Sequence, residues 1–522
     1  MYAPETWNNL CHTLVYPPHC TAEGVISMRE SGILMHISSL PGPYGIGSIG
    51  APARTFIDFL EKAGQRCWQI LPLSPTGYGD SPYQSCSAYA GNHYLIDLDA
   101  LVQEGLLLQQ ELAGIDWCAR EDTVDFGILY RHRLSILRTA YGRFLGSAEF
   151  DQFCRDNSSW LPDFALFMAL KDQFDGKPWY QWEEPLMLRQ PEAIWQVRRE
   201  RKDEIRFYSF VQYLFFRQWD QLRFYAHERN VRIIGDVPIY VPYDSADVWC
   251  NPELFQLDER LNPSMVAGVP PDGFTEDGQL WGNPLYRWDI LQQDGYSWWI
   301  NRLAAAGKLY DVIRLDHFRG FESYWAVPYG EETAQNGHWV KGPGMDFISA
   351  VKQQLSGLSL IAEDLGYLTP EVLQLRENSG FPGMKVLEFA FDSREPSDYL
   401  PHTYTRNAVC YTGTHDNMTC RQWLETAADE AVDYAAEYMH LTQEEGYVWG
   451  MIRTAFASVA DLCIIQIQDY LGLGGEARMN CPGTLSASNW TWRAYEGFAT
   501  DLLARKIRRM TTLYCRTGIE NA

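Results

Sequence analysis

Eight short apolar runs recur along the chain, and each ends abruptly in polar residues. They begin at Gly32, Cys67, Val231, Val312, Leu358, Met384, Ala408 and Cys463. Runs that are apolar on both faces and separated by stretches of helical period are typical of parallel strands joined by crossover helices. Eight such units predict an α/β fold, a (β/α)8 TIM barrel whose active site lies at the C-terminal ends of its strands.

The spacing of these runs predicts large insertions around the C-terminal face of the barrel. The chain has 522 residues, whereas a minimal barrel takes about 250. We expect a catalytic barrel over 30–515, with insertions at about 100–210 and 244–290. A long helical run from Ser209 to Arg229 precedes the third strand, and the Gly, Pro, Asn and Asp content of 244–290 favours loop structure. Residues 1–29 are expected to form an N-terminal extension.

Composition excludes several classes of partner. The chain carries 67 acidic and 43 basic residues, a net charge of −24, which argues against nucleic acid and against an anionic membrane surface. It has no C-x-x-C pair, and Cys67, Cys410 and Cys463 lie in apolar runs, which predicts reduced, buried thiols and a reducing compartment. Without a signal peptide or a long apolar span, we expect a soluble, cytoplasmic protein.

Acidic side chains stand at the ends of four predicted strands. The third ends in Asp236, the fourth in Arg314–His317, the fifth in Glu363–Asp364 and the seventh in His415–Asn417. Alternation along a strand puts Arg314 and Asp316 on the same side. We therefore expect several carboxyl groups around one cavity, where like charges raise one another's pKa.

Two carboxyl groups on either side of a glycosidic bond are what sugar transfer requires. Asp316 beside Arg314 suits an ionised nucleophile. Glu363 follows Leu-Ile-Ala, an apolar setting that would raise its pKa and suits a general acid. Either carboxylate alone is better explained as a structural ion pair or helix cap, and only their joint placement favours catalysis. A retaining enzyme would hold the two carboxyl groups about 5–5.5 Å apart.

The motifs RLDH (314–317), AEDLG (362–366) and THDN (414–417) resemble those of the 4-α-glucanotransferases, the amylomaltases or disproportionating enzymes of glycoside hydrolase family 77. The resemblance continues through HISSLPGPYGIGSIG, SPYQSCSAYAGNHYLIDL, GDVPIYVPYDSADVW, DGQLWGNPLY, GFPGMKVLEF, RMNCPGT and NWTWR. It covers nearly the whole chain after residue 30, and the catalytic motifs show no departure from it.

This resemblance implies transfer of α-1,4-glucan segments to the 4-hydroxyl of an acceptor by a retaining double displacement. It implies Asp316 as nucleophile, Glu363 as general acid/base and Asp416 as a third acid that binds sugar hydroxyls and stabilises the transition state. It implies malto-oligosaccharides and α-1,4-glucans as substrates, with no cofactor and no metal. Sugar contacts are implied for Tyr83, Asp236, Asp272, Gln279, Trp281, Arg314, His317, His415 and Asn489.

Transfer also requires that an acceptor be bound better than water is admitted. The segment GVPPDGFTEDGQLWGNPLYRW offers aromatic platforms for an acceptor at Phe274, Trp281, Tyr286 and Trp288. Three alternatives stay open: an α-glucan hydrolase, a non-catalytic glucan-binding module, and a metal-dependent barrel hydrolase. The last would use His317, Asp316, His415 and Asp416 as ligands, although the first strand offers only a lone His36. The sequence makes no prediction of oligomeric state.

Overall fold

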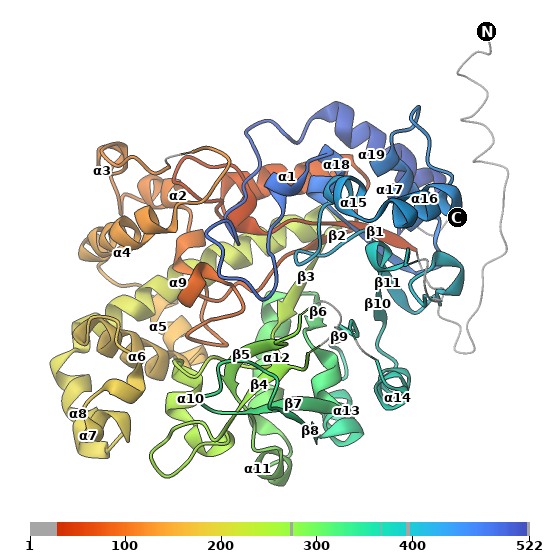
Figure 1. Ribbon diagram of the computed structural model, residues 1–522. Coiled ribbons are helices and arrows are strands. Elements are labelled where there is room, and N and C mark those ends of the chain that lie inside the picture. The colour runs from red at the N-terminus through yellow and green to blue at the C-terminus, as the bar shows by residue number, and fades with distance from the viewer. Residues whose placement is uncertain (1–28, 119, 272–274, 367, 393–396, 519–522) are drawn as a thin grey trace.

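The computed structural model describes residues 29–118, 120–271, 275–366, 368–392 and 397–518 (Figure 1). Residues 1–28 of the expected N-terminal extension, the proposed sugar contact Asp272 and the proposed acceptor platform Phe274 lie outside these ranges.

Eight parallel strands form the central sheet, in the order β10-β11-β12-β1-β2-β3-β6-β9. They are β1 (Glu30–Leu34), β2 (Cys67–Gln69), β3 (Arg232–Val237), β6 (Val312–Leu315), β9 (Ser359–Ala362), β10 (Gly383–Val386), β11 (Ala408–Tyr411) and β12 (Leu462–Gln466). At the remaining junction, the Ala362 N–H at the end of β9 donates to the Pro382 carbonyl, just before β10 (2.9 Å). Each predicted run overlaps one of these strands, so the TIM barrel is confirmed.

Helices alternate with the strands and cover the outside of the barrel. The strand residues are buried almost throughout, because both faces of a parallel strand pack against other elements. The helices outside the two largest insertions are α1 (Ala51–Lys62), α13 (Gly344–Gln354), α14 (Pro370–Ser379), α15 (Cys420–Thr426), α16 (Asp429–Met439), α17 (Tyr447–Ala457), α18 (Ile467–Leu471) and α19 (Asp501–Leu513).

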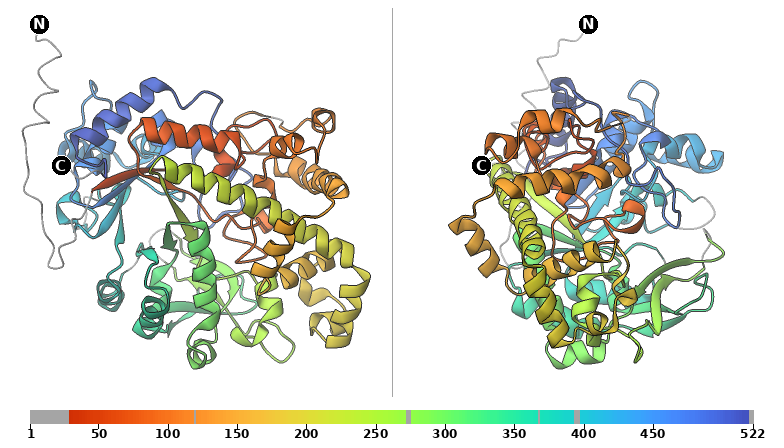
Figure 2. Two further views of the ribbon diagram at one scale, coloured as in Figure 1. Left: turned by 180° about the vertical axis from the view of Figure 1, so that it is seen from behind. Right: turned by 90° about the vertical axis from the view of Figure 1, so that its left-hand side faces the viewer.

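The segment between β2 and β3 is helical. It contains α2 (Leu98–Gln103), α3 (Gln109–Ala113), α4 (Phe126–Arg143), α5 (Ala148–Asp156), α6 (Leu161–Gln173), α7 (Glu184–Met187), α8 (Pro191–Glu200) and α9 (Lys202–Glu228). The predicted helical run is confirmed as part of α9, which begins seven residues before Ser209. Seen from behind, α9 runs from the barrel to the outlying helices of this segment (Figure 2).

A second, four-stranded antiparallel sheet stands beside the barrel, in the order β5-β4-β7-β8 (Figure 1). Its strands are β4 (Met265–Val269), β5 (Gln279–Pro284), β7 (Ser323–Pro328) and β8 (His338–Lys341), with α10 (Ala246–Cys250), α11 (Trp288–Gln293) and α12 (Ser297–Leu309) nearby in the chain. The expectation of loop structure over 244–290 is therefore wrong in part. A Cβ at Gly268 would lie 2.7 Å from the Gln279 carbonyl, so this glycine permits close strand pairing.

The predicted burial of three cysteines is confirmed. Cys67, Cys410 and Cys463 are free thiols and fully buried in the barrel core. Among the described helices, none is both long enough and apolar enough to cross a membrane.

Candidate active site

The ends of β3 and β6 carry a buried charge cluster. Asp236 of β3 pairs in register with Arg314 of β6. Arg314 Nη1 donates to Asp236 Oδ2 at 2.6 Å and to Asp316 Oδ1 at 2.8 Å, so one nitrogen bridges both carboxylates. Arg314 and Asp236 are buried, whereas the Asp316 side chain is 26% exposed. Asp316 is thus the member of this group that a ligand in the barrel mouth can reach.

Tyr83, from the loop after β2, forms the wall of the cluster. Its hydroxyl donates to Asp236 Oδ2 at 2.8 Å. Burial, followed by the neighbouring Asp316 charge, raises the pKa of Asp236 to about 7, although Arg314 opposes this shift. Burial disfavours the charged form of Arg314, but the two aspartates outweigh it and hold the Arg314 pKa well above its ordinary value. The buried Arg314 cation is therefore shared by Asp236 and Asp316.

Glu363 follows β9, the strand next to β6. Its carboxylate accepts two backbone hydrogen bonds, from His317 N–H at 2.7 Å and from Leu365 N–H at 2.9 Å. Burial and the nearby Asp316 charge raise its pKa to about 7, against the opposing effects of Arg314 and the two N–H donors. The carboxyl group is held in one orientation and can carry a proton near neutral pH.

The loop after β11 presents His415 and Asp416. His415 is buried, stacks on Tyr83 (ring centroids 5.2 Å apart) and lies 3.4 Å from Asp416 Oδ2. Burial lowers its pKa. Asp416 Oδ1 accepts from Asn480 at 2.6 Å, and Arg478 donates to the Asp416 carbonyl at 2.7 Å. The Asp416 side chain is 42% exposed, so it is fixed on one side and open on the other.

Trp281 and Gln279 come from β5 of the second sheet. Trp281 meets the His317 ring edge-on at 4.8 Å, and its indole N–H donates to the Gln279 side chain at 3.2 Å. Two other proposed acceptor platforms lie elsewhere. Tyr286 is fully buried and donates to the Ile239 carbonyl, and the half-buried Trp288 packs against Trp299. The acceptor prediction is therefore wrong for Tyr286, whose ring is enclosed in the core. For Trp288 it stays a prediction.

The side chain of Asn489 makes its hydrogen bonds within its own loop. Its amide accepts from Cys481 N–H at 3.1 Å and donates to the Thr484 carbonyl at 3.0 Å. The next residue, Trp490, places its ring against both Tyr83 and His415. In the described geometry Asn489 therefore shapes the loop that carries Trp490 to the site.

A family model described as 4-alpha-glucanotransferase matches residues 35–497. The chain belongs to the 4-alpha-glucanotransferase family. The family member from Clostridium butyricum is 50% identical over 486 residues, which cover 92% of this chain and 100% of that protein. The one from Streptococcus pneumoniae is 48% identical over 493 residues, covering 94% and 97%. An amylomaltase from Streptococcus agalactiae in complex with acarbose has a TM-score of 0.91 at 40% identity, covering 94% of this chain and 99% of that chain.

Membership of the 4-alpha-glucanotransferase family confirms the sequence-based assignment of family and enzyme class. It favours a glucan transferase over the three alternatives. Within the residues that the structure describes, no three His, Cys, Asp or Glu side chains gather in an arrangement that could hold a metal ion. The four ligands considered for a metal-dependent hydrolase do not form such a group.

Sequence reasoning missed three residues around the site of this 4-alpha-glucanotransferase. Arg478 and Asn480 hold Asp416, and Trp490 packs against His415. These three residues lie in the sequence blocks RMNCPGT and NWTWR, which resemble the family's motifs. The resemblance alone gave no role to their side chains. Asp364, in contrast, points away from the cluster, since its carboxylate accepts from Met384 N–H and pairs with Arg376.

Proposed function

We propose that Asp316 and Glu363 carry out the glucan transfer of this family as nucleophile and general acid/base. The observation that carries the proposal is the difference between their surroundings. Asp316 is partly exposed and paired with the buried Arg314. Glu363 is buried, and its raised pKa of about 7 keeps a proton available near neutral pH. A double displacement requires one carboxylate that attacks the anomeric carbon and a second carboxyl group that can give up a proton.

In the first step an Asp316 oxygen attacks the anomeric carbon while the glycosidic C–O bond breaks. The proton on Glu363 goes to the departing glucan oxygen, leaving a glycosyl ester on Asp316 and an ionised Glu363. In the second step the acceptor 4-hydroxyl loses its proton to Glu363 as its oxygen attacks the anomeric carbon. The ester bond breaks, and both carboxyl groups return to their starting states.

The remaining polar residues fit roles in binding and charge stabilisation. The open side of Asp416 can accept hydrogen bonds from sugar hydroxyls, while Asn480 fixes its other oxygen. We propose sugar contacts for Tyr83, Asp236, Asp272, Gln279, Trp281, Arg314, His317, His415 and Asn489. For Tyr83 and Asp236 the mutual hydrogen bond supports a shared wall of the binding site.

The position of Trp281 supports the proposal that the site favours a glucan acceptor over water. Its ring is partly exposed and meets His317, the residue next to Asp316. Aromatic faces bind the apolar faces of sugar rings, so Trp281 can hold an acceptor near the glycosyl ester and limit entry of water. This favours transfer over hydrolysis.

Malto-oligosaccharides and longer α-1,4-glucans are the proposed substrates, and the cytoplasm the proposed compartment. The amylomaltase from Streptococcus agalactiae was solved in complex with acarbose, an oligosaccharide analogue. Free thiols at every described cysteine are consistent with a reducing compartment. The proposed unit is a catalytic barrel over 30–515, with insertions at about 100–210 and 244–290 and an extension before residue 30.

Incubation with maltotriose tests the proposal. Glucose together with a ladder of longer oligosaccharides is expected, with or without chelator. Glucose and maltose alone would indicate hydrolysis, and loss of activity with chelator would indicate a metal-dependent enzyme. Asp316→Asn and Glu363→Gln should each abolish the ladder while the circular dichroism spectrum stays unchanged. Near-normal turnover in either variant would remove that residue from its role.

A further inference from the structure

The loop 412–419 carries Asp416 between β11 and α15. One fully buried side chain, Asp469 of α18, contacts both ends of this loop. Asp469 Oδ2 accepts from the Thr412 hydroxyl at 2.6 Å, and Asp469 Oδ1 accepts from the Cys420 N–H at 2.7 Å. Thr412 directly follows β11 and Cys420 begins α15, so a single carboxylate spans the loop at its base.

The burial of Asp469 keeps it out of contact with a glucan. Its exposed fraction is zero, and so is that of Thr412. Burying a carboxylate costs free energy unless it is hydrogen-bonded, and here each of its oxygens accepts a hydrogen bond. Hydrogen bonds to an ionised acceptor are shorter and about twice as strong as neutral ones. The two bonds therefore restrain the separation of the loop ends more firmly than a neutral side chain would.

A second buried acid, Glu388, helps to show that Asp469 is ionised. The Glu388 N–H donates to the Thr412 carbonyl at 3.2 Å. Burial, followed by the Asp469 charge, holds the pKa of Glu388 well above its ordinary value, although Arg478 opposes this shift. Burial also raises the pKa of Asp469, but the hydrogen bonds from Thr412 and Cys420 oppose that shift. Glu388 therefore keeps its proton to a higher pH than Asp469 does, and Asp469 carries the charge.

The chain that follows Asp469 holds the middle of the same loop. Arg478 donates to the Asp416 carbonyl at 2.7 Å, and the Asn480 side chain donates to Asp416 Oδ1 at 2.6 Å. The Asn480 N–H donates to the His415 carbonyl at 3.1 Å. Asp469 thus fixes the base of the loop, and residues a few positions later fix Asp416 itself.

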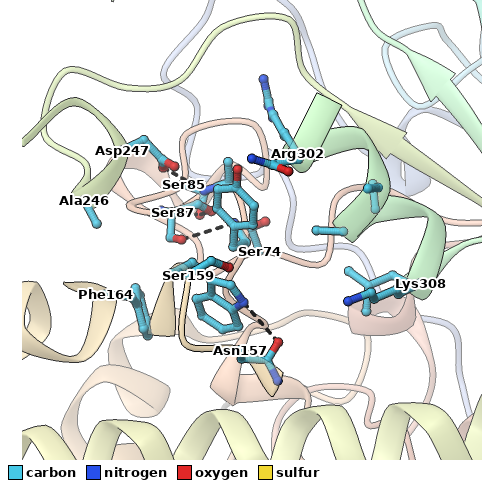
Figure 3. A pocket seen from close by; sticks show the side chains of 18 of the residues that line it. Ser74, Ser85, Ser87, Asn157, Ser159, Phe164, Ala246, Asp247, Arg302 and Lys308 are labelled. Carbon is cyan, nitrogen blue, oxygen red and sulfur yellow. Dashed lines mark hydrogen bonds between the residues drawn. The ribbon is translucent and has the colours of Figure 1, made fainter. Parts of the chain in front are cut away.

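Another buried aspartate, Asp247, offers a comparison. It lines the cavity between α9 and α12, beside Ser85 and Ser87 (Figure 3). Its carboxylate accepts from the Ala88 N–H at 2.8 Å, so it contacts the loop after β2 at that point. A carboxylate that joins both ends of a loop, as Asp469 does, restrains every residue between them.

From these contacts we infer that Asp469 is a positioning residue for the transfer reaction. Its carboxylate sets the distance between Thr412 and Cys420 and thereby the position of Asp416 against the sugar in the transition state. This inference rests on the proposed role of Asp416. A misplacement of about 1 Å can cost on the order of 100-fold in rate, so loss of an Asp469 contact should act on kcat.

Thr412→Val tests this inference with little change in side-chain shape. It removes the hydroxyl that donates to Asp469 Oδ2 and leaves the hydrogen bond from Cys420 in place. We expect kcat for maltotriose transfer to fall by about tenfold, with a smaller change in KM. Thr412→Ser keeps the hydroxyl and should restore most of the rate.

Thr511 of α19 provides the matched control. It is also fully buried, and its hydroxyl donates to the Ile507 carbonyl at 3.0 Å and accepts from Gln65 at 2.8 Å. Thr511→Val should lower the Tm but leave kcat per folded molecule at the wild-type value, because α19 covers the outside of the barrel. An unchanged kcat in Thr412→Val, or an equal loss of kcat in Thr511→Val, would overturn the inference.

A second variant covers the case in which Thr412→Val does not fold. In Asp469→Asn the amide keeps the side-chain volume, can accept from Cys420 and can donate to the Thr412 hydroxyl, but these neutral hydrogen bonds are weaker. We expect a several-fold loss of kcat, and a smaller loss in an Asn480→Ala background, because both changes act through Asp416.

Two outcomes of the Asp469→Asn experiment would contradict the positioning role. They are a wild-type kcat in the single variant, and losses that simply multiply when Asp469→Asn and Asn480→Ala are combined. Failure of the proposed function has a different signature, the absence of the maltotriose ladder in wild type.

Discussion

The backbone N–H of His317 donates a hydrogen bond of 2.7 Å to the Glu363 carboxylate. His317 adopts a left-handed conformation (φ 51°), and the next amide, of Phe318, donates to the Glu363 carbonyl at 3.0 Å. The residue that follows Asp316 thus fixes Glu363, which comes directly after the neighbouring strand. The turn after β6 couples the positions of the two acids.

Substitution at position 317 should separate this backbone role from the role of the imidazole. His317→Val places a β-branched residue at positive φ, which costs about 1–3 kcal/mol, and should disturb the turn that orients Glu363. His317→Asn also removes the imidazole but tolerates this conformation. We expect a larger loss of kcat and of thermal stability in the Val variant, measured by initial rates and calorimetry. Equal losses in both variants would show that only the side chain matters.

The pH dependence of transfer should have an alkaline limb near pH 7. Glu363 must be protonated to act as an acid, and its protonated fraction falls as the pH rises through its pKa of about 7. We therefore expect kcat/KM for maltotriose to decline above that value. With α-maltosyl fluoride, whose leaving group needs no proton, the glycosylation step should lose this limb. An alkaline limb that persists unchanged with the fluoride would assign it to another group.

Glu363 should also make the protein less stable as the pH rises. Its folded pKa of about 7 lies above the ordinary value of 4.5, so the folded state binds more protons between these values and stability falls across that window. From about pH 5 to about pH 8, wild type should lose on the order of 1–3 kcal/mol more than Glu363→Gln. Urea unfolding at both pH values measures this difference.

Glu363→Gln also loses the acceptor for one of the two backbone N–H groups, and the cost of that loss does not depend on pH. Measuring each protein at two pH values and comparing the differences cancels this cost. Asp236, whose pKa is raised in the same direction, contributes in both proteins. Parallel pH dependence of wild type and Glu363→Gln would contradict the assigned pKa of Glu363.

Asn480 should act on turnover through the position of Asp416. Asn480→Ala removes the 2.6 Å hydrogen bond to Asp416 Oδ1 and frees that carboxylate to rotate. We expect kcat to fall by about 10- to 100-fold with a smaller change in KM. Asn336→Ala, which removes an exposed hydrogen bond to Glu331, is the matched control. If Asn480→Ala raises KM alone, Asp416 binds substrate without a positional requirement in the transition state.

The products should keep the α configuration of the donor. Asp316 and Glu363 follow adjacent strands, and retention requires carboxyl groups about 5–5.5 Å apart. Proton NMR of early products from α-maltosyl fluoride, read before mutarotation, reports the anomer that forms first. Initial β products would indicate inversion and exclude Asp316 as the nucleophile.

Much of this protein was predictable from local sequence. The eight barrel strands are apolar on both faces, a pattern that arises from burial between a packed interior and covering helices. The acids at strand ends were predictable for the same reason, since parallel strands bring their C-terminal ends to one edge. The second sheet was not predicted, because glycine content indicates a loop, whereas Gly268 lies in a strand and permits close approach to the Gln279 carbonyl.

The sequence by itself determined the barrel, the family and the set of polar residues at the strand ends. Only the tertiary structure decided what each side chain does there. Arg314 bridges two acids, Tyr286 fills the core, and Asn489 binds its own loop. Strand periodicity is a local property that one segment displays alone. Hydrogen bonds, ring contacts and burial depend on residues that are far apart in the sequence, such as the stacked rings of Tyr83 and His415, and arise only when the chain folds.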